Sequence, residues 1–280
     1  QKLKNLRLKI LNKNKNFRFY KVDLSNFNNL NKIFKAQKFD LIINLAAQAG
    51  VRHSIKKPRD YFNSNSIGFF NILELSRINN IKKIIYASSS SVYGEQKKFP
   101  IKENSKLNPK NIYSQTKKNN EEIAEIYSRI YNINLLGLRF FTVYGEWGRP
   151  DMLMIKYILN KKKNSTFVLN NRGNHYRDFT YIRDVILIIE KLIFSKKFFR
   201  NEIVNVCSNY PLKVTNVLKK INKLIGRPNI KHQKRLKIEV YKTHGSNDKI
   251  KKLTKFKKFT GIDEGLKNLI DWSNDYLSKI

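Results

Sequence analysis

The fold is decided by the stretch Tyr113-Ser-Gln-Thr-Lys117, read together with the serine run Ser88–Ser91 just upstream. Tyr113 and Lys117 are four residues apart, and residues 119–130 continue in a helical pattern, so both side chains lie on one face of one helix. A lysine ammonium beside a phenol favours the phenolate, which lowers the tyrosine pKa and makes it a general base for a substrate hydroxyl. Taken alone, the motif fits an amphipathic surface helix equally well.

A short buried strand over residues 84–87 ends directly at the serine run. Ligands of open α/β sheets bind outside the carboxyl ends of the strands, which places these serines for chemistry. A polar serine-rich loop is the simpler interpretation. A serine-rich loop alone does not predict that a strand, a row of hydroxyls and Tyr-x-x-x-Lys follow one another. Their order along the chain therefore indicates a catalytic site.

Strand patterns alternate with helix patterns along the first half of the chain, which predicts a parallel α/β sheet with right-handed crossovers. The expected strands are 17–22, 41–45, 84–87 and 135–140, and the expected helices are 58–79, 112–131 and a helix capped by Ser25 that runs to 36. Past residue 150 the expected elements are helices 152–159, 181–194, 214–225 and 265–276, with strands 166–169 and 203–206. We therefore expect two parts, 1–145 and a smaller mixed α/β part, 146–280, that are threaded together.

The formal charge of +36 raises nucleic acid as a partner. The lysines are spread along the whole chain, however, so runs such as 161–163 and 249–258 are interpreted as solvated helix faces, and no specific nucleic-acid partner is expected. The single cysteine, Cys207, is interpreted as a buried thiol, and the four histidines make no metal-ligand spacing with it. With no membrane span or secretory signal visible, we expect a cytoplasmic protein without a metal.

With these motifs the sequence resembles the extended short-chain dehydrogenase/reductases, and among them the nucleotide-sugar epimerases. The resemblance rests on Ala87-Ser-Ser-Ser-Ser-Val-Tyr-Gly94 with Tyr113-x-x-x-Lys117. Further stretches look like the UDP-glucuronate 4-epimerases: Asn44-Leu-Ala-Ala-Gln-Ala-Gly-Val-Arg52, Leu138-Arg-Phe-Phe-Thr-Val-Tyr-Gly145, Trp147-Gly-Arg-Pro-Asp-Met152 and Arg177-Asp-Phe-Thr-Tyr-Ile182. It implies a Rossmann-like, doubly wound parallel sheet, NAD as the cofactor and a UDP-sugar as the substrate.

The family's first β-α-β unit, with its glycine-rich turn, has no counterpart here, because Gly50 is the first glycine of the chain. We expect the strand at 41–45 to keep an unpaired edge in consequence. We also expect the 280-residue form, expressed alone, to be unstable and not to bind NAD.

The resemblance assigns roles residue by residue. Tyr113 takes the proton of the sugar 4-hydroxyl while C4 gives hydride to NAD, and hydride then returns to the opposite face. Lys117 lowers the tyrosine pKa and binds the nicotinamide ribose, and Ser89 is the hydroxyl partner. Ser90 and Ser91 contact the substrate, although turn formation is the plain interpretation of such serines.

For the cofactor, the resemblance places Asp23 and Leu24 at the adenine, and Leu45, Ala46 and Ala47 along the dinucleotide. Asn65 would lie on the nicotinamide side. Ordinary strand-end packing is the alternative for these residues, above all for Leu45 and Ala46.

For the substrate, Arg149 and Thr142 would serve the uronate carboxylate, because a planar guanidinium forms paired hydrogen bonds with a carboxylate. Arg149 could instead be one of many surface basic residues. Arg177 would bind the UDP diphosphate. Two departures concern this pocket: no glycine follows Asn205, and Ile238 stands where the family usually has glycine.

Three readings remain. The leading one is an NAD-dependent UDP-glucuronate 4-epimerase, with a possible homodimer through helices starting near Pro58 and Ile112. A nucleotide-sugar 4,6-dehydratase is a second, but Ser90 and Ser91 stand where its Asp-Glu pair would be. A non-catalytic remnant or polyanion-binding protein is the third.

Overall fold

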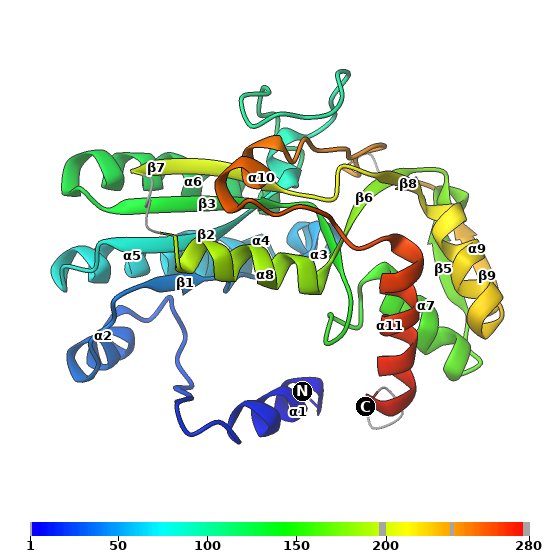
Figure 1. Cartoon of the computed structure of the whole chain (residues 1–280), viewed down its shortest axis with the longest axis horizontal. Helices are drawn as coiled ribbons and strands as arrows, with labels where there is room; N and C mark the ends of the chain where they lie inside the picture. The colour runs from blue at the N-terminus through cyan, green and yellow to red at the C-terminus, as the bar shows by residue number, and fades with distance from the viewer. Residues whose placement is uncertain (1, 196–199, 236–237, 277–280) are drawn as a thin grey trace.

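The computed structural model describes residues 2–195, 200–235 and 238–276, and its centre is a parallel four-stranded sheet (Figure 1). The strand order is β1-β2-β3-β7, and every neighbouring pair is parallel. The strands are β1 (Ile42–Asn44), β2 (Lys83–Ser89), β3 (Asn134–Phe140) and β7 (Asn201–Val206). The predicted parallel sheet is confirmed.

Helices cover both faces of this sheet. Successive side chains along a strand point to opposite faces, so the apolar side chains on each face need a helix to cover them. Ile84 and Tyr86 pack with α5 (Gly68–Ile78) and α6 (Ile112–Tyr131). Ile85 packs on the other side. The helices of that side are α8 (Ile182–Ile193) and α10 (Asp248–Thr254). The sheet is therefore doubly wound, as predicted.

The helix expected over 58–79 is one helical run with a wider turn in its middle. It consists of α4 (Pro58–Tyr61), the π-helical η1 (Phe62–Ile67) and α5. The short α3 (Val51–Lys56) precedes it. Pro58 stands in the first turn, where its missing N–H costs nothing.

Two predictions near the N-terminus were wrong in detail. The N-cap of α2 (Phe27–Ala36) is Asn26, whose side chain accepts from the Asn29 N–H, while Ser25 bonds to Asp23 instead. Residues 17–22 form no strand, and Phe19 and Tyr20 are exposed. An extended segment becomes a strand only by pairing, and no described strand pairs with it.

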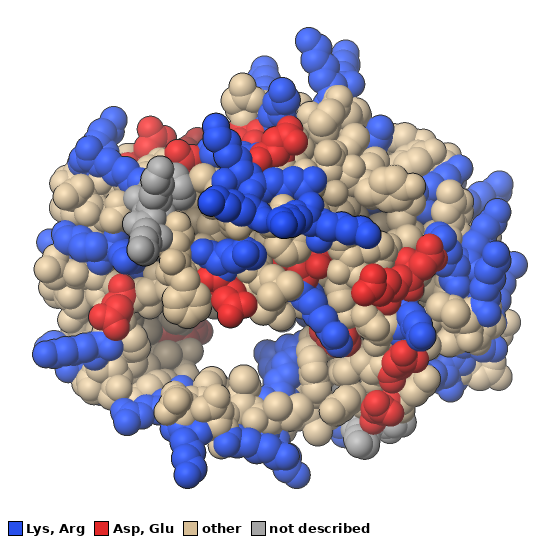
Figure 2. Space-filling model, in the orientation of Figure 1, with Lys and Arg blue, Asp and Glu red and all other residues tan. Residues whose placement is uncertain are grey.

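An unexpected helix, α1 (Lys2–Leu11), stands at the end of the segment that leads away from the sheet (Figure 1). Its Arg7 donates a hydrogen bond to the Trp147 carbonyl. Between this segment and the body of the molecule, the space-filling view shows an opening (Figure 2). The outer edge of β1 has no partner strand among the described residues, and Ile43 and Leu45 are exposed, which agrees with the expected unpaired edge.

The second part of the chain has its own core. Its strands are β4 (Thr142–Tyr144), β5 (Phe167–Asn170), β6 (Tyr176–Tyr181), β8 (Pro211–Lys213) and β9 (Ile230–Gln233). Its helices are α7 (Leu153–Lys162), α9 (Val214–Ile225) and α11 (Ile262–Tyr276), with the short 3-10 turn η3 (Asn171–Gly173). The other 3-10 turn, η2 (Ser90–Tyr93), follows β2 of the first sheet. The β4-β6-β8 sheet is mixed, since β6 pairs parallel with β4 and antiparallel with β8.

The two parts are threaded, because the chain passes from β6 into α8 and β7 of the first sheet and then back to β8. A division of the chain at residue 145 stays a prediction. No helix in the described ranges is long and apolar enough to cross a membrane, and a cytoplasmic location also stays a prediction. Lysine and arginine side chains are spread widely over the face shown in Figure 2, with acidic groups between them.

Candidate functional site

Helix α6 places Tyr113 and Lys117, and its start is fixed by a capping box. Asn111, in extended conformation, accepts from the Ser114 N–H at 2.9 Å, and the Asn111 N–H donates to Ser114 Oγ at 3.2 Å. Two otherwise orphaned N–H groups are satisfied in this way. Tyr113 therefore lies in the first turn, and Lys117 lies one turn further along the same face.

The serine run forms the carboxyl end of β2 and the 3-10 turn η2. Ser89 is buried and caps that turn: its Oγ accepts from the Ser91 N–H at 3.2 Å and from Ser91 Oγ at 2.9 Å. The Ser89 hydroxyl also lies near the Tyr113 phenol, where it acts to lower the tyrosine pKa. The structure thus brings Ser89, Ser91 and Tyr113 together, and Ser90 lies half-buried in the same turn.

Lys117 is buried, with 3% of its surface exposed, and its Nζ donates to the Ala87 carbonyl at 2.7 Å. Burial lowers its pKa to about 8, and the charge of Glu121 opposes that lowering. The Tyr113 pKa is raised by burial, while the Ser89 hydrogen bond and the charge of Arg149 act to lower it. The predicted lowering by Lys117 is not seen; the ammonium faces a β2 carbonyl, and the groups that favour the phenolate are Ser89 and Arg149.

The loop after β1 is held by one buried amide. Asn65, in η1, accepts from the Gln48 N–H at 2.7 Å and donates to the Gln48 carbonyl at 3.1 Å and to Thr116 Oγ1 at 3.0 Å. Its amide is fully engaged in protein contacts, so its position fixes the loop that carries Leu45, Ala46 and Ala47. In that loop Leu45 and Ala46 are exposed and Ala47 is half-buried.

Asp23 and Leu24 lie apart from the group around Tyr113. The Asp23 carboxylate is exposed and accepts from the N–H and the hydroxyl of Ser25, and these bonds lower its pKa. The Leu24 carbonyl accepts from Asn71 of α5 at 2.8 Å. Because residues 17–22 form no strand, these contacts are those of a turn before α2 and not of a strand end.

Arg149 lies close to the tyrosine. A Cβ atom added to Gly50 would lie 3.6 Å from Arg149 Nη2. The Arg149 guanidinium therefore lies against the backbone of Gly50, just after the β1 loop. The Tyr61 hydroxyl lies beside the same point and donates to the Gly50 carbonyl at 2.7 Å, and the rings of Tyr61 and Tyr113 are 6.2 Å apart. Sequence reasoning missed Tyr61, which no motif distinguishes.

Thr142 and Arg149 line one cavity of about 230 Å³, together with Met152 and residues of β4 and α7. A larger hollow of about 730 Å³ lies between α8, α11 and residues 143–148. None of the predicted site residues lines it, so we place the site by its chemistry, at the strand ends, and not by the size of the hollow.

Arg177 belongs to a separate group of cations. Its Nη1 donates to the carbonyls of Tyr176 at 2.7 Å and Tyr241 at 3.2 Å, and burial lowers its pKa to about 10 against the charges of Glu239 and Glu95. Arg52 lies nearby and binds Glu239 through Nε at 2.7 Å.

The same cations act on His175. Burial, together with the charges of Arg177, Arg52 and Arg235, lowers the His175 pKa to about 4. Such a cluster suits an anionic group. Sequence reasoning missed Arg52 and Arg235, although Arg52 ends the quoted stretch that begins at Asn44.

The donor set fits one half of a dinucleotide. A buried ammonium, a phenol and an exposed loop backbone stand together at the ends of β1 and β2, as the nicotinamide and its ribose require. No glycine-rich turn leads into a helix beside β1 in the described part of the chain, where the pyrophosphate would need one. The expectation that the 280-residue form does not bind NAD stays a prediction. The described residues also contain no group of three or more His, Cys, Asp or Glu that could hold a metal ion.

Comparison with known proteins gives a family and several relatives. The family model described as "NAD dependent epimerase/dehydratase family" matches residues 3–207. "Protein CapI" of Staphylococcus aureus is 38% identical over 99% of this chain and 88% of its own. UDP-glucuronate 4-epimerase of Thermodesulfobacterium geofontis is 35% identical over 99% of this chain and 86% of its own. The crystal structure of UDP-glucuronic acid 4-epimerase from Bacillus cereus with UDP-glucuronic acid and NAD is 27% identical, covers 98% of this chain and 86% of that one, and superposes with a TM-score of 0.90.

Proposed function

Because the chain belongs to the NAD-dependent epimerase/dehydratase family, we propose that it interconverts UDP-glucuronate and UDP-galacturonate by inverting C4 of the sugar. The chain is an NAD-dependent UDP-sugar 4-epimerase, as its relatives are. The identity of the sugar is our proposal. The observation that carries it is the position of Arg149, which lies next to Tyr113 and shares a cavity with Thr142.

Arg149 supplies the preference for a uronate. Its side chain already binds one carboxylate, that of Asp151, through Nε and Nη2, and the Nη1 group has no hydrogen-bond partner among the described residues. The free edge of the guanidinium can therefore bind a second carboxylate. A neutral glucose or galactose would leave this edge unpaired, and Thr142, which lines the same cavity, would add a hydroxyl.

Tyr113 carries the proton. It removes the proton from the 4-hydroxyl oxygen and returns one after the configuration has changed, and Ser89 acts to lower the pKa of its phenol. NAD supplies the acceptor and donor of the C4 hydride when it is bound. Lys117 would hold the cofactor ribose from its buried position against the Ala87 carbonyl. Ser90 and Ser91 would contact the sugar.

The remaining assignments follow the family pattern. Asp23 and Leu24 would bind the adenine, and the backbone of Leu45, Ala46 and Ala47 would lie along the dinucleotide. Asn65 would support the nicotinamide side by fixing this loop. For the substrate, Arg177 would bind the diphosphate, and we add Arg52 and Arg235 because all three cations surround His175.

A dehydratase is the second candidate, and the geometry disfavours it. Elimination of water needs an acid and a base after Ser89, and those positions are Ser90 and Ser91. Ser91 donates to Ser89 and brings no carboxylate to the site.

The test is an assay of the product of the full reading frame with NAD and each of two sugars, UDP-glucuronate and UDP-glucose, because we predict that the 280-residue form expressed alone does not bind NAD. We expect UDP-galacturonate from the first and little turnover of the second. Tyr113→Phe should abolish turnover, while Tyr131→Phe, a substitution at the far end of the same helix, should not. Equal turnover of both sugars would reject the proposed substrate, and a 4-keto-6-deoxy product would reject the epimerase in favour of the dehydratase.

A further inference from the structure

Behind the candidate site lies a buried ion pair between Glu121 of α6 and Arg139 of β3. The guanidinium donates from Nε to Oε1 at 2.9 Å and from Nη2 to Oε2 at 2.7 Å. Only 7% of Glu121 and 4% of Arg139 is exposed. Sequence reasoning singled out neither residue for a role.

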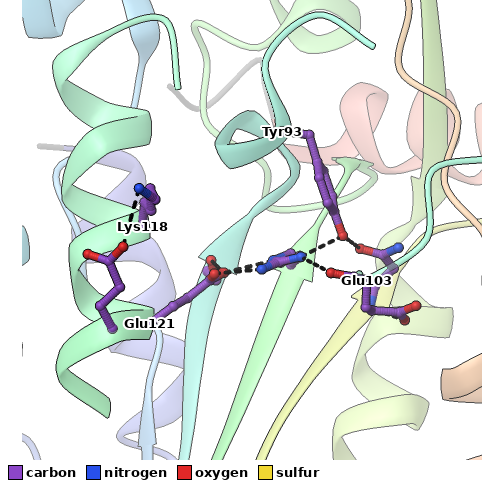
Figure 3. A network of polar contacts seen from close by, with 8 residues as sticks. Tyr93, Glu103, Lys118 and Glu121 are labelled. Carbon is purple, nitrogen blue, oxygen red and sulfur yellow. Dashed lines mark hydrogen bonds and ion pairs between the residues drawn. The ribbon is translucent and has the colours of Figure 1, made fainter. Parts of the chain in front are cut away.

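Both members of the pair form further hydrogen bonds. Arg139 Nη1 donates to the Tyr93 hydroxyl and to the Glu103 carbonyl, each at 2.8 Å, and the guanidinium stacks over the Tyr93 ring. Tyr93 in turn donates to Asn205 of β7 at 2.7 Å. Figure 3 shows Glu121 on one side of the Arg139 guanidinium, and Tyr93 and Glu103 on the other. Arg139 is thus locked in place, and it locks Glu121.

Glu121 is linked to the candidate site through α6 and through the end of β2. It lies four residues after Lys117 and eight after Tyr113, so all three side chains stand on one face of α6. Its carboxylate also accepts a hydrogen bond from the Ser88 hydroxyl, and Ser88 immediately precedes Ser89. One carboxylate therefore links the helix that carries the base to the strand end that carries its hydroxyl partner.

Stability alone does not account for this arrangement. Burying two charges costs desolvation, and well-packed apolar replacements of a buried ion pair are often neutral or stabilising. The charge of Glu121, however, acts directly on the buried ammonium of Lys117 and opposes the effect of burial on it. A role toward Lys117 gives a reason for the charge that packing does not give.

We propose that Glu121, fixed by Arg139, is a positioning residue of the reaction: it holds Lys117 in its charged form and holds Ser89 against Tyr113. The proposal rests on the roles of Tyr113 and Lys117 in the proposed function. Glu121 itself touches neither sugar nor cofactor. It acts through Lys117 and through the Ser88–Ser89 strand end.

The charged and titratable groups around Lys117 come from each neighbouring element. Tyr113 and Glu121 belong to α6, Tyr86 and the Ala87 carbonyl to β2, and Arg139 to β3. Tyr93 lies beyond Arg139 in η2, and Glu103 lies in the loop behind it. Glu121 is the carboxylate of this set that favours the ammonium.

The test compares Glu121→Gln, the double variant Glu121→Gln/Arg139→Gln and the control Glu122→Gln. Glu122 is the next residue of the helix but lies on its outer face, where it pairs with Lys118 at 3.2 Å (Figure 3 labels Lys118). The double variant leaves no unpaired buried charge, so it separates a positioning role from a loss of folding. Each variant is assayed for kcat and KM against pH.

We expect both Glu121 variants to lose kcat by about tenfold or more, with KM changed about twofold at most. The pH above which activity falls should move down by about one unit, since the ammonium of Lys117 is lost earlier without the carboxylate. Glu122→Gln should behave as the wild type. A double variant with wild-type kcat and a wild-type alkaline limb would overturn the proposal.

A second measurement needs no cofactor and no substrate. The side-chain NMR signal of Lys117, assigned by its loss in Lys117→Met, is titrated in the wild type and in the double variant. We expect a lower midpoint in the double variant, and an unchanged midpoint would overturn the proposal. If the wild type turned over no UDP-sugar, the proposed function would fail, while this titration would still show whether Glu121 holds the charge on Lys117.

Discussion

Asp151 holds the Arg149 guanidinium through two hydrogen bonds, from Nε to Oδ1 at 3.0 Å and from Nη2 to Oδ2 at 2.6 Å. The pairing fixes the plane of the guanidinium and raises the Arg149 pKa, while burial acts in the opposite direction. The arginine is therefore pre-oriented beside Tyr113 before any ligand arrives. Pre-orientation reduces the entropy that binding must otherwise lose.

Arg149→Gln is expected to raise KM for UDP-glucuronate about tenfold or more, because a hydrogen-bonded charge pair contributes about 1.5–3 kcal/mol. Steady-state kinetics with UDP-glucuronate measure it. The control is Arg183→Gln, which removes another partly exposed arginine paired with a glutamate, Glu146 at 2.8 Å. An unchanged KM in Arg149→Gln would show that the uronate carboxylate binds elsewhere.

Lys117→Met is expected to stabilise the protein while abolishing activity. The Lys117 pKa is lowered to about 8 in the folded state, against 10.5 for the free side chain. Between these values the unfolded chain binds more protons than the folded one, so stability rises with pH through this window and is reduced below pH 8. Removing the buried ammonium should raise the free energy of unfolding at pH 7 by about 1–3 kcal/mol.

Denaturant unfolding of the wild type and Lys117→Met at pH 7 and at pH 10 measures this difference. The gap between the two proteins should be largest at pH 7 and should shrink by pH 10. Lys118→Met, at the next residue on the exposed side of α6, is the control and should show no such dependence. A gap that stayed constant with pH would contradict the assignment to Lys117.

Asn65→Ala is expected to lower the free energy of unfolding by about 1–3 kcal/mol, because it leaves the N–H and carbonyl of Gln48 without their partner. The loop that carries Leu45 to Ala47 should loosen, so kcat should fall as well. Asn63→Ala, at an exposed position of the same π-helical turn, should change neither quantity. Thermal unfolding of the two variants measures the change in stability, and steady-state kinetics measure the change in kcat.

A homodimer through α5 and α6 remains our proposal from the family pattern, and the two helices offer an apolar face for it. Phe70 of α5 and Ile126 and Ile130 of α6 are all exposed, by 45%, 45% and 61%. Solvent-facing apolar groups of this kind mark an interaction surface when they are contiguous. Ile126→Glu/Ile130→Glu should convert a dimer to a monomer in light scattering, whereas Ile186→Glu on α8 should not.

Much of the fold follows from local sequence. The helical pattern after Tyr113 predicts the helix over 112–131, which agrees with α6, so the face shared by Tyr113 and Lys117 could be predicted; the capping box at Asn111 came from the structure. The apolar runs at 84–87 and 135–138 predict β2 and β3 because strands buried on both faces are mostly apolar, and β3 continues through the buried Arg139 to Phe140. Helix α9 was predicted with the bounds that it has.

Strand pairing and the surroundings of the site residues depend on partners that are distant in the sequence. Residues 17–22 have a strand-like pattern, yet a strand exists only where a neighbour pairs with it. The chemical setting of Tyr113 depends on Ser89 and Arg149, and that of Lys117 depends on Glu121 and on burial under β2. Burial and charge act through space, so their balance could not be obtained from the spacing of a motif.

Local sequence patterns are enough to identify the residues that can do chemistry, namely a phenol, an ammonium and a hydroxyl on elements whose order those patterns predict. The contact of Arg139 on β3 with Glu121 on α6, and that of Arg52 with Glu239 across 187 residues of chain, depend on how the whole chain folds. Helix periodicity and capping act between residues a few positions apart. Ion pairs and strand pairing depend on which surfaces the whole chain brings together.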